Sequence, residues 1–385
     1  MPFPPLAAVP AFFAFCSLAY YFLSILAASR FRGQPKNLVV TDLPSVSILK
    51  PVKGCDPEMY EGLRSHCTQD YPQFEIVFGV NDGGDEAIPF IARLKSEFPD
   101  VPIRTVVSSQ VLGANRKVSN LAQMLGEAEF EYVLINDADI HVPANYLRDV
   151  MSEFSSAEGK KVGMVTCLYR GIAGKTIWSK LEAMGINVDF MAGVLTAQLL
   201  ERDVKFALGS TMATTREAIT AIGGLETLVH HLADDYELGN RIARAGYRVV
   251  IANAVVETFL PDYRFKDFFE HQLRWGRTVR SSRPGGYMGM VFTFGMVWAL
   301  IAAFVNPTPL AWLLLAGVIA GKALVAFAVG RRVIGDREAL KNLWLLPLRE
   351  MVTPLVWLIS LFGSKIVWRG ESFTLRDGKL TKRDA

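Results

Sequence analysis

The chain has 385 residues, of which 51% are hydrophobic and 21% are charged, and its formal net charge is +3. This length allows one sizeable domain with further elements attached, and so small a net charge argues against a nucleic-acid partner. The apolar residues gather near the two ends, and a normally charged stretch lies between residues 29 and 286. This distribution indicates one α/β domain held at a membrane.

The first apolar segment, residues 6–28, contains no charged residue and is followed by Arg30 and Arg32. Its length is sufficient to cross a bilayer core of about 30 Å. A cleavable signal peptide is the alternative, but the apolar core is too long for one and no basic region precedes it. We predict a retained transmembrane helix with the N-terminus outside and the central domain in the cytosol, because basic residues favour the cytosolic end.

The first half of the central domain alternates β-rich runs with helical patterns. The predicted strands cover residues 45–49, 75–80, 103–107 and 131–135, and the predicted helices between them cover residues 57–67, 85–97 and 117–125. This order indicates a mostly parallel sheet, in which ligands bind beyond the carboxyl ends of the strands. Polar residues follow three of these strands: Lys50 and Lys53, then Asp82, then Asp137 and Asp139. They predict a site for a charged, hydrogen-bonding ligand.

Asp137 and Asp139 stand two residues apart, directly after the strand that ends at Ile135. Carboxylates at this spacing can face one hard cation, and Mg²⁺ or Mn²⁺ prefers few carboxylates together with phosphate oxygens. The alternative is an Asx turn that caps a helix near Pro143. The pair alone leaves both interpretations open.

A second acidic pair, Asp234 and Asp235, begins a helical pattern that ends near Ala245 and Gly246. Its members could be catalytic, or they could be an N-cap and a first-turn partner of the helix dipole. Two other helical patterns, residues 176–200 and 265–280, predict helices lying on the membrane surface, because they mix apolar and charged residues.

Further apolar segments follow the central domain. Residues 287–305 and 309–329 predict two transmembrane helices separated by a proline-containing turn. Residues 343–362 include Arg349 and Glu350, which are costly in lipid unless they are paired or face protein. We therefore expect a re-entrant, interfacial or fourth membrane helix there, followed by a basic cytosolic tail at residues 363–385.

Asp82, Asp137-Ala138-Asp139, Asp235 and Arg274-Trp275 occur in the order of a known pattern. It resembles the D, DxD, D, (Q/R)xxRW pattern of family 2-like inverting glycosyltransferases. The closer resemblance is to the ceramide glucosyltransferases of family 21, and it covers nearly the whole chain. Its clearest segments are residues 45–82, 113–121, 223–249, 347–352 and 367–375. The chain departs from the pattern at His271, where Gln or Arg is usual; in this it resembles bacterial hopanoid-associated glycosyltransferases.

The resemblance implies an α/β GT-A domain, Rossmann-like, at residues 45–283 between N- and C-terminal transmembrane helices. It also implies a UDP-sugar donor, a divalent metal (Mg²⁺ or Mn²⁺) and a lipid alcohol acceptor in the bilayer. The implied catalytic residues are Asp235 as general base, Arg274 opposite the diphosphate, Trp275 at the mouth of the site and His271 as a hydrogen-bond donor. The implied nucleotide-sugar-binding residues are Lys53, Asp82, Lys117 and Asp137, and the implied metal ligands are Asp137 and Asp139.

The expected activity is transfer of a single sugar, glucose, from a UDP-sugar to the hydroxyl of a membrane lipid. A hopanoid lipid N-acetylglucosaminyltransferase and a processive polysaccharide synthase are the alternative enzymes, although a synthase channel needs more spanning helices than this chain offers. A non-enzymatic receptor for nucleotide sugars would not need Asp235 together with the Arg-Trp helix. We expect a multi-pass protein with its catalytic domain in the cytosol, in a bacterial plasma membrane or, in a eukaryote, the Golgi.

Overall fold

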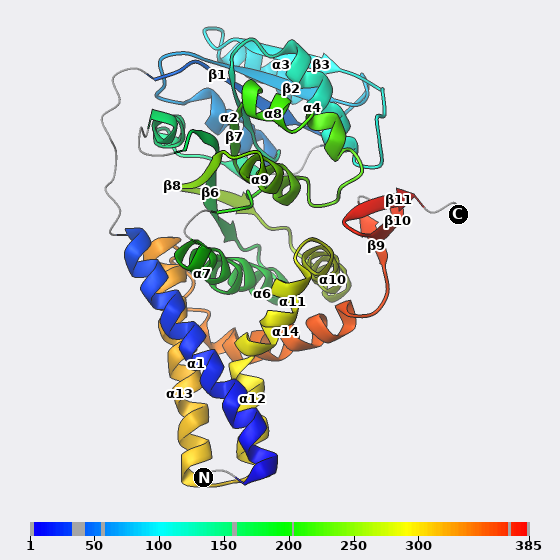
Figure 1. Ribbon diagram of the computed structural model, residues 1–385. Helices are drawn as coiled ribbons and strands as arrows, with labels where there is room; N and C mark the ends of the chain where they lie inside the picture. Colours follow the sequence, from blue (N-terminus) through cyan, green and yellow to red (C-terminus); the bar gives the residue numbers. More distant parts are fainter. Residues whose placement is uncertain are drawn as a thin grey trace. The chain divides into compact units, whose positions relative to one another are not determined.

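The computed structural model describes residues 4–32, 43–54, 58–155, 160–201, 204–368 and 371–382. The chain divides into two compact units, each built from separate stretches of sequence. The helical unit contains residues 1–34, 170–200 and 260–377, and the sheet unit contains residues 35–169, 201–259 and 378–385. Figure 1 labels most of the helices and strands of both.

The sheet unit is built on an eight-stranded sheet with the strand order β3-β2-β1-β4-β7-β6-β8-β5. Strands β1 to β4 are parallel neighbours, as predicted, whereas β7 runs antiparallel to β4 and β6, and β5 runs antiparallel to β8. The strands are β1 (Val46–Pro51), β2 (Phe74–Val80), β3 (Ile103–Val107), β4 (Tyr132–Ile135), β5 (Ile140–His141), β6 (Val162–Ile172), β7 (Met212–Thr215) and β8 (Arg248–Phe259).

Helices cover this sheet, and one of them approaches it unusually closely. A Cβ atom on Gly79 of β2 would lie 2.3 Å from Met124 Sδ, so only glycine lets α4 pack at this distance. This close packing holds the first turn of α4 beside the carboxyl ends of the parallel strands. The helices of the unit are α2 (Met59–Cys67), α3 (Ala87–Glu97), α4 (Arg116–Glu127), α5 (Tyr146–Met151), α8 (Arg216–Ala221) and α9 (Asp234–Arg244).

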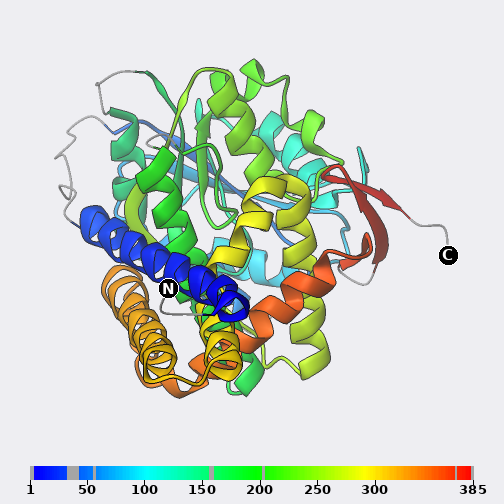
Figure 2. The same cartoon turned by 60° about the horizontal axis from the view of Figure 1, so that its bottom comes forward.

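Three apolar helices of the helical unit pack side by side (Figures 1 and 2). They are α1 (Pro5–Arg32), α12 (Gly295–Val305) and α13 (Pro309–Val325), and α13 continues as a π-helix, η5 (Ala326–Val333). Gly295 permits the contact between α12 and α1, since a Cβ there would lie 2.8 Å from the hydroxyl oxygen of Tyr21. Helices Leu6–Arg32 and Pro309–Val333 are long and apolar enough to cross a membrane.

The segment expected as one helix over residues 287–305 is instead broken. It consists of α11 (Pro284–Gly289), a 3-10 turn η4 (Met290–Thr293) and α12, and the axis bends by 48° at the break. Phe294, between the pieces, has a non-helical ψ of 48°. Because α12 alone is only about 16 Å long at 1.5 Å per residue, it needs the preceding turns to span a bilayer.

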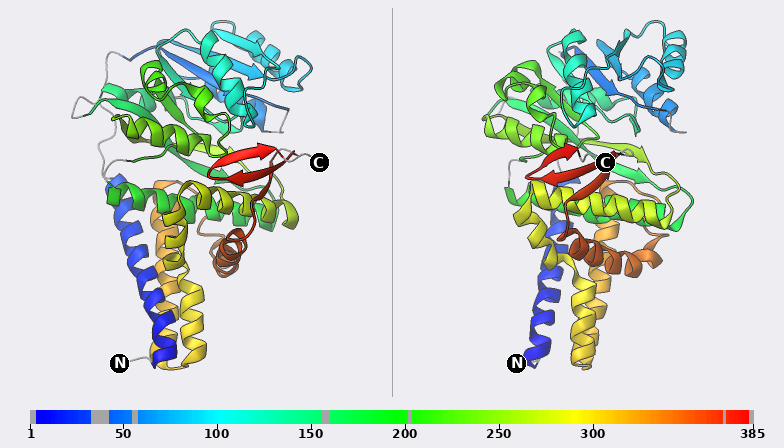
Figure 3. Two further views of the ribbon diagram at one scale, coloured as in Figure 1. Left: turned by 45° about the vertical axis from the view of Figure 1, so that its right-hand side comes forward. Right: turned by 90° about the vertical axis from the view of Figure 1, so that its right-hand side faces the viewer.

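The other long helices of this unit run crosswise to the bundle of α1, α12 and α13 (Figure 3). They are α6 (Ile177–Met184), which continues through the π-helix η2 (Gly185–Phe190) into α7 (Met191–Glu201), and also α10 (Phe265–Ser282) and α14 (Leu346–Ser360). The stretches Ile177–Glu201 and Leu343–Ser360 are also long and apolar enough to cross a membrane. Their crosswise direction fits the expected surface helices.

Four charged residues of the apolar helices are paired with one another inside the helical unit. Lys322 Nζ lies 2.7 Å from Asp189 Oδ1 and 2.8 Å from Glu350 Oε1. Arg349 Nε donates to Asp189 Oδ2 at 2.9 Å, and its Nη1 donates to Gln272 Oε1 at 2.9 Å. Two cations and two carboxylates therefore neutralise one another, which removes the cost that their presence in apolar segments would otherwise carry.

The predicted basic tail contains strands. In the helical unit, β9 (Lys365–Trp368) pairs antiparallel with β10 (Glu371–Arg376). In the sheet unit, β11 (Lys379–Lys382) forms an antiparallel bridge between Lys379 and His231. The end of α14 is held within the helical unit by Arg280, whose Nη1 donates to the carbonyl of Ser360 at 2.7 Å.

Candidate active site

One lysine, whose side chain is 12% exposed, joins two acidic segments of the sheet unit. Lys117 Nζ lies 2.7 Å from Asp137 Oδ1 and 3.0 Å from Asp234 Oδ2. Lys117 is the second residue of α4, and Asn115 caps this helix by accepting the N–H of Val118 at 3.2 Å. The chain segments after β4 and before α9 therefore meet at the N-terminal turn of α4.

Gly209 brings the predicted metal ligand and the predicted base to the same place. A Cβ atom on Gly209 would lie 3.1 Å from Asp137 Oδ2 and 3.3 Å from Asp235 Oδ2. The N–H of Gly209 also donates to Asp235 Oδ2 at 3.0 Å, and Asp235 Oδ1 accepts the N–H of Tyr236 at 2.7 Å. Two carboxylates thus lie beside the same glycine, where a larger side chain would crowd them.

The surroundings shift the pKa values of Asp235 and Lys117, with different consequences for their charges. Burial, and next the charge of Asp234, raise the pKa of Asp235 to about 6. Burial alone would lower the pKa of Lys117, but Asp137 and Asp234 raise it above its ordinary value, so the lysine stays charged. Near neutral pH Asp235 can therefore both hold and release a proton, which is the property of a general base.

Asp139 and Lys50 lie around the same turn. Asp139 Oδ2 accepts the hydroxyl of Thr258 at 2.8 Å, and burial together with the nearby Asp137 raises the pKa of Asp139. Lys50 is fully buried and donates from Nζ to the backbone carbonyl of Asp137 at 2.7 Å. Burial lowers the pKa of Lys50 to about 7, despite Asp139 and Asp137. The side chain of Asp139 therefore binds Thr258 and does not cap α5. The N-cap residue of α5 is Asn145, which makes no capping hydrogen bond with its side chain.

These residues fit a divalent cation that has few protein ligands. Asp137 and Asp139 offer hard oxygen donors, and a cation between them would offset both the burial and the negative charge of Asp137 that raise the pKa of Asp139. Over the ranges that the structure describes, no cluster of three or more His, Cys, Asp or Glu could hold a metal. A metal at Asp137 and Asp139 would therefore depend on oxygens of a bound ligand, as Mg²⁺ commonly does.

Two predicted nucleotide-binding residues follow β1 and β2 at the same edge of the sheet. Pro51 of β1 is in register with Gly79 of β2, so both strands end together. Lys53 is exposed, and Asp82 forms an Asx turn in which its Oδ1 accepts the N–H of Gly84 at 2.9 Å. Both lie beyond carboxyl ends, the usual ligand side of such sheets; their contact with a nucleotide stays a prediction.

His271, Arg274 and Trp275 lie on α10, in the helical unit. His271 Nδ1 is 3.0 Å from Glu182 Oε1, and Gln272 donates to Glu182 Oε2 at 2.7 Å. The rings of His271 and Trp275 are 5.6 Å apart. The predicted site residues thus lie partly in the sheet unit, where some gather around Lys117 and where Lys53 and Asp82 follow β1 and β2, and partly on α10 of the helical unit.

Several contacts in these groups were not predicted. Asn115 and Asp234 share a hydrogen bond of 3.4 Å, and Glu182 supports His271 from another helix. Asn115 before a helical pattern is a recognisable N-cap signal, whereas no local signal marks Glu182, since its role depends on the packing of α6 against α10.

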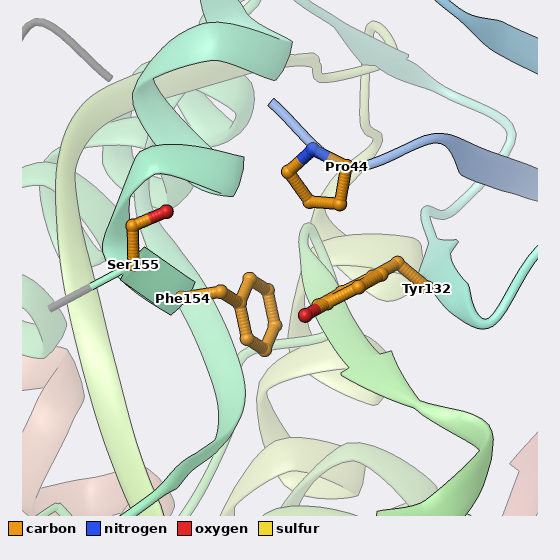
Figure 4. A pocket seen from close by; sticks show the side chains of 4 residues that line it. All are labelled: Pro44, Tyr132, Phe154 and Ser155. Carbon is orange, nitrogen blue, oxygen red and sulfur yellow. The ribbon is translucent and has the colours of Figure 1, made fainter. Parts of the chain in front are cut away.

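A pocket elsewhere in the sheet unit lacks such chemistry. It is lined by Pro44, Tyr132, Phe154 and Ser155 (Figure 4). Pro44 precedes β1 and Tyr132 begins β4, so this pocket lies at the amino ends of the parallel strands, opposite to the edge that carries Asp137. None of its four lining side chains is a carboxylate or a cation.

Comparisons with known proteins bear on the family and the fold of the chain. Ceramide glucosyltransferase 3 of Caenorhabditis elegans is 24% identical over 375 residues, which cover 95% of this chain and 80% of that protein. Ceramide glucosyltransferase of Candida albicans is 32% identical over 116 residues, or 27% of this chain and 21% of that protein. A mannosyltransferase from Pyrobaculum calidifontis, solved with GDP-mannose and Mn²⁺, has a similar fold: the TM-score is 0.52, the identity 19%, and the match covers 92% of this chain and 97% of that one.

The predicted GT-A fold is confirmed by this structural similarity. The model of glycosyl transferase family 21 matches residues 9–381, almost the entire chain. The chain therefore belongs to glycosyltransferase family 21, and it is an enzyme of that family.

Proposed function

We propose that this protein transfers one sugar, glucose, from UDP-glucose to the hydroxyl group of a membrane lipid, with ceramide as the first candidate acceptor. The observation that carries this proposal is the meeting of Asp137 and Asp235 at Gly209. A carboxylate suited to the donor's diphosphate and a carboxylate suited to the acceptor's proton lie beside the same glycine. The relatives, which are ceramide glucosyltransferases, support both substrate classes.

In this mechanism Asp235 takes the proton from the acceptor hydroxyl. The hydroxyl oxygen then attacks the anomeric carbon of the sugar, and the bond between that carbon and the diphosphate breaks on the opposite face, which inverts the configuration. The N–H groups of Gly209 and Tyr236 hold the two oxygens of Asp235 in place. Lys117 holds Asp137 and remains positively charged next to the leaving diphosphate.

Asp137 and Asp139 would hold Mg²⁺ or Mn²⁺. When bound, the cation supplies positive charge that stabilises the departing diphosphate. Arg274 on α10 carries the same kind of charge in the family pattern, and Trp275 supplies an apolar surface for the sugar or the lipid. These three assignments rest on the match of the sequence to the pattern, and substitution of each residue tests them.

The protein is a membrane protein, and we propose its topology from a parity argument. Leu380 donates its N–H to the carbonyl of His230 at 2.7 Å, and Leu232 donates to the carbonyl of Gly378 at 3.2 Å. These pairs lie inside the sheet unit, so the chain must return to the side of the membrane that it left after Phe259. If the η4–α12 segment and α13 cross once each, α14 does not cross. With positive residues at the end of α1, this side is the cytosol.

Charge pairing and exposure on α14 support this arrangement. Its buried face carries Arg349 and Glu350, which are paired within the unit. Its other face exposes apolar residues at helical spacing, which suits a helix lying at the lipid surface. These residues are Trp344 (just before the helix), Leu348, Met351, Leu355, Leu358 and Phe362 (just after it).

The test is release of UDP by the purified protein in detergent with UDP-glucose, with and without a mixed lipid extract. A single-sugar lipid transferase releases UDP in proportion to the added lipid. A processive synthase releases UDP and makes polymer without added lipid, and a receptor releases none; either result would overturn the proposal.

A further inference from the structure

The loop that leads into α9 is held on two sides. On one side, the backbone N–H of Asn115 donates to the carbonyl of Val229 at 2.7 Å, and Asn115 Nδ2 donates to the carbonyl of His231 at 2.8 Å. On the other side, β11 supplies the two backbone hydrogen bonds of His230 and Leu232 described above. Successive peptide groups of the loop therefore alternate between α4 and the C-terminal strand, as in a central strand of a sheet.

Asp234 and Asp235 follow this loop directly, so its position sets theirs. Asp234 has further anchors of its own, because its two oxygens contact Lys117 and Asn115. The side-chain hydrogen-bond partners of Asp235 are the backbone N–H groups of Gly209 and Tyr236. Asp235 thus depends on where the backbone enters α9.

The contact between the loop and β11 includes buried apolar side chains. Leu380 is 3% exposed and Leu232 is 7% exposed, whereas the side chains of Lys379, Thr381 and Lys382 are exposed. The strand thus buries one leucine in the sheet unit and presents polar residues to solvent. Gly378, with a φ of 77°, lets the chain turn into the strand; a Cβ there would lie 3.6 Å from His231 Nδ1.

We infer that the C-terminal strand β11, anchored by Leu380, is a positioning element of the active site that holds the loop 229–233 and thereby places Asp235 for proton removal. This inference rests on the proposed function, because it assigns the base to Asp235. It gives a role in catalysis to a part of the segment that the sequence predicts as a basic cytosolic tail.

A matched pair of variants tests it. Leu380→Asp introduces a carboxylate on the buried face of β11, and Thr381→Asp introduces the same group one residue later on the exposed face. We expect Leu380→Asp to lower kcat by about 10²-fold, since small displacements of a catalytic group have effects of this size. We expect Thr381→Asp to stay near the native rate, and the donor dissociation constant, measured by calorimetry, to change little in either variant.

The pH profile separates positioning from a general loss of stability. If the loop moves, the environment that Asp234 creates around Asp235 changes, and the acidic limb of kcat/KM shifts in the Leu380 variant. A loss of folded protein scales the whole profile without moving the limb. Leu380→Ala, which removes the anchor without adding charge, carries the test alone if Leu380→Asp fails to fold by thermal unfolding.

Equal rates and an unshifted limb in the Leu380 and Thr381 variants would overturn the inference. That outcome is distinct from failure of the proposed function, which would appear as no sugar transfer by the native chain. Loss of donor affinity in step with kcat would also overturn it, because the strand would then support the sheet unit as a whole.

Discussion

The two neighbouring aspartates at the start of α9 should differ sharply in their contribution to transfer. Asp235→Asn keeps the size of the side chain, and its amide oxygen can still accept the N–H of Gly209, but it cannot take a proton. We expect transfer to fall by about 10²- to 10⁴-fold, the usual contribution of a general base. Asp234→Asn should cost much less, because Lys117 keeps its contact with Asp137 and Asn115 can still donate to the new side chain.

The same pair makes a prediction about pH. With a pKa of about 6, Asp235 is ionised by about ten to one at pH 7, and kcat/KM should fall about tenfold per unit well below pH 6. Asp234→Asn removes a negative charge that raises the pKa of Asp235, so the acidic limb should move to lower pH. The assay is UDP release between about pH 5 and pH 8, with donor affinity from calorimetry for the native chain and both variants.

Three results would refute this reasoning. Asp235→Asn could transfer at a near-native rate, Asp234→Asn could be the inactive variant, or the acidic limb could move to higher pH in Asp234→Asn. The first two remove Asp235 as the base, and the third contradicts the electrostatic cause of its raised pKa. Calorimetry shows whether each variant still binds the donor. A variant that no longer binds the donor gives no information on proton transfer.

The remaining predictions concern the metal, the glycine at position 209 and the topology. EDTA should abolish transfer, Mg²⁺ or Mn²⁺ should restore it, and Asp139→Asn should lose most turnover; full activity in EDTA would remove the metal role. Gly209→Ala should strongly reduce transfer because its Cβ would crowd both carboxylates, whereas Gly126→Ala, with nothing within 4 Å, should be neutral; equal rates would contradict the arrangement. Lys382→Cys should resist an impermeant thiol reagent added outside intact cells, and labelling above the native background would overturn the topology.

Local sequence patterns predicted the first four strands of the sheet unit. Runs of five or six residues with helical patterns between them predicted β1 to β4 as parallel strands, because each βαβ step is local in sequence. The later strands escaped prediction. β6 and β8 join the sheet as non-local antiparallel partners, and the pairing of β11 with the loop before α9 links residues about 150 positions apart in the chain, where no local pattern signals the contact.

The candidate site was predictable where the pattern lay in short motifs. The carboxylates after β4 were recognised from the strand exit and their spacing, and those of α9 from the start of a helical pattern. The roles expected of Asp235 and Lys117 came from the resemblance to the family. Spacing could not decide which member of the pair Asp234 and Asp235 lies beside Gly209. That choice depends on the side-chain partners that α4 supplies. For Glu350, the sequence predicted only that a charge in an apolar segment needs a partner or a protein surface. It did not identify Lys322 as that partner.

The claim that one sugar passes to a lipid is tested most directly by the mass of the product. The purified protein is incubated with uniformly ¹³C-labelled UDP-glucose and a lipid extract, and the lipids are then analysed by mass spectrometry. We predict a lipid species that is heavier by a single labelled hexose, formed by the native chain and absent with Asp235→Asn. Label recovered only in polymer or free glucose, with no glycosylated lipid, would contradict the account.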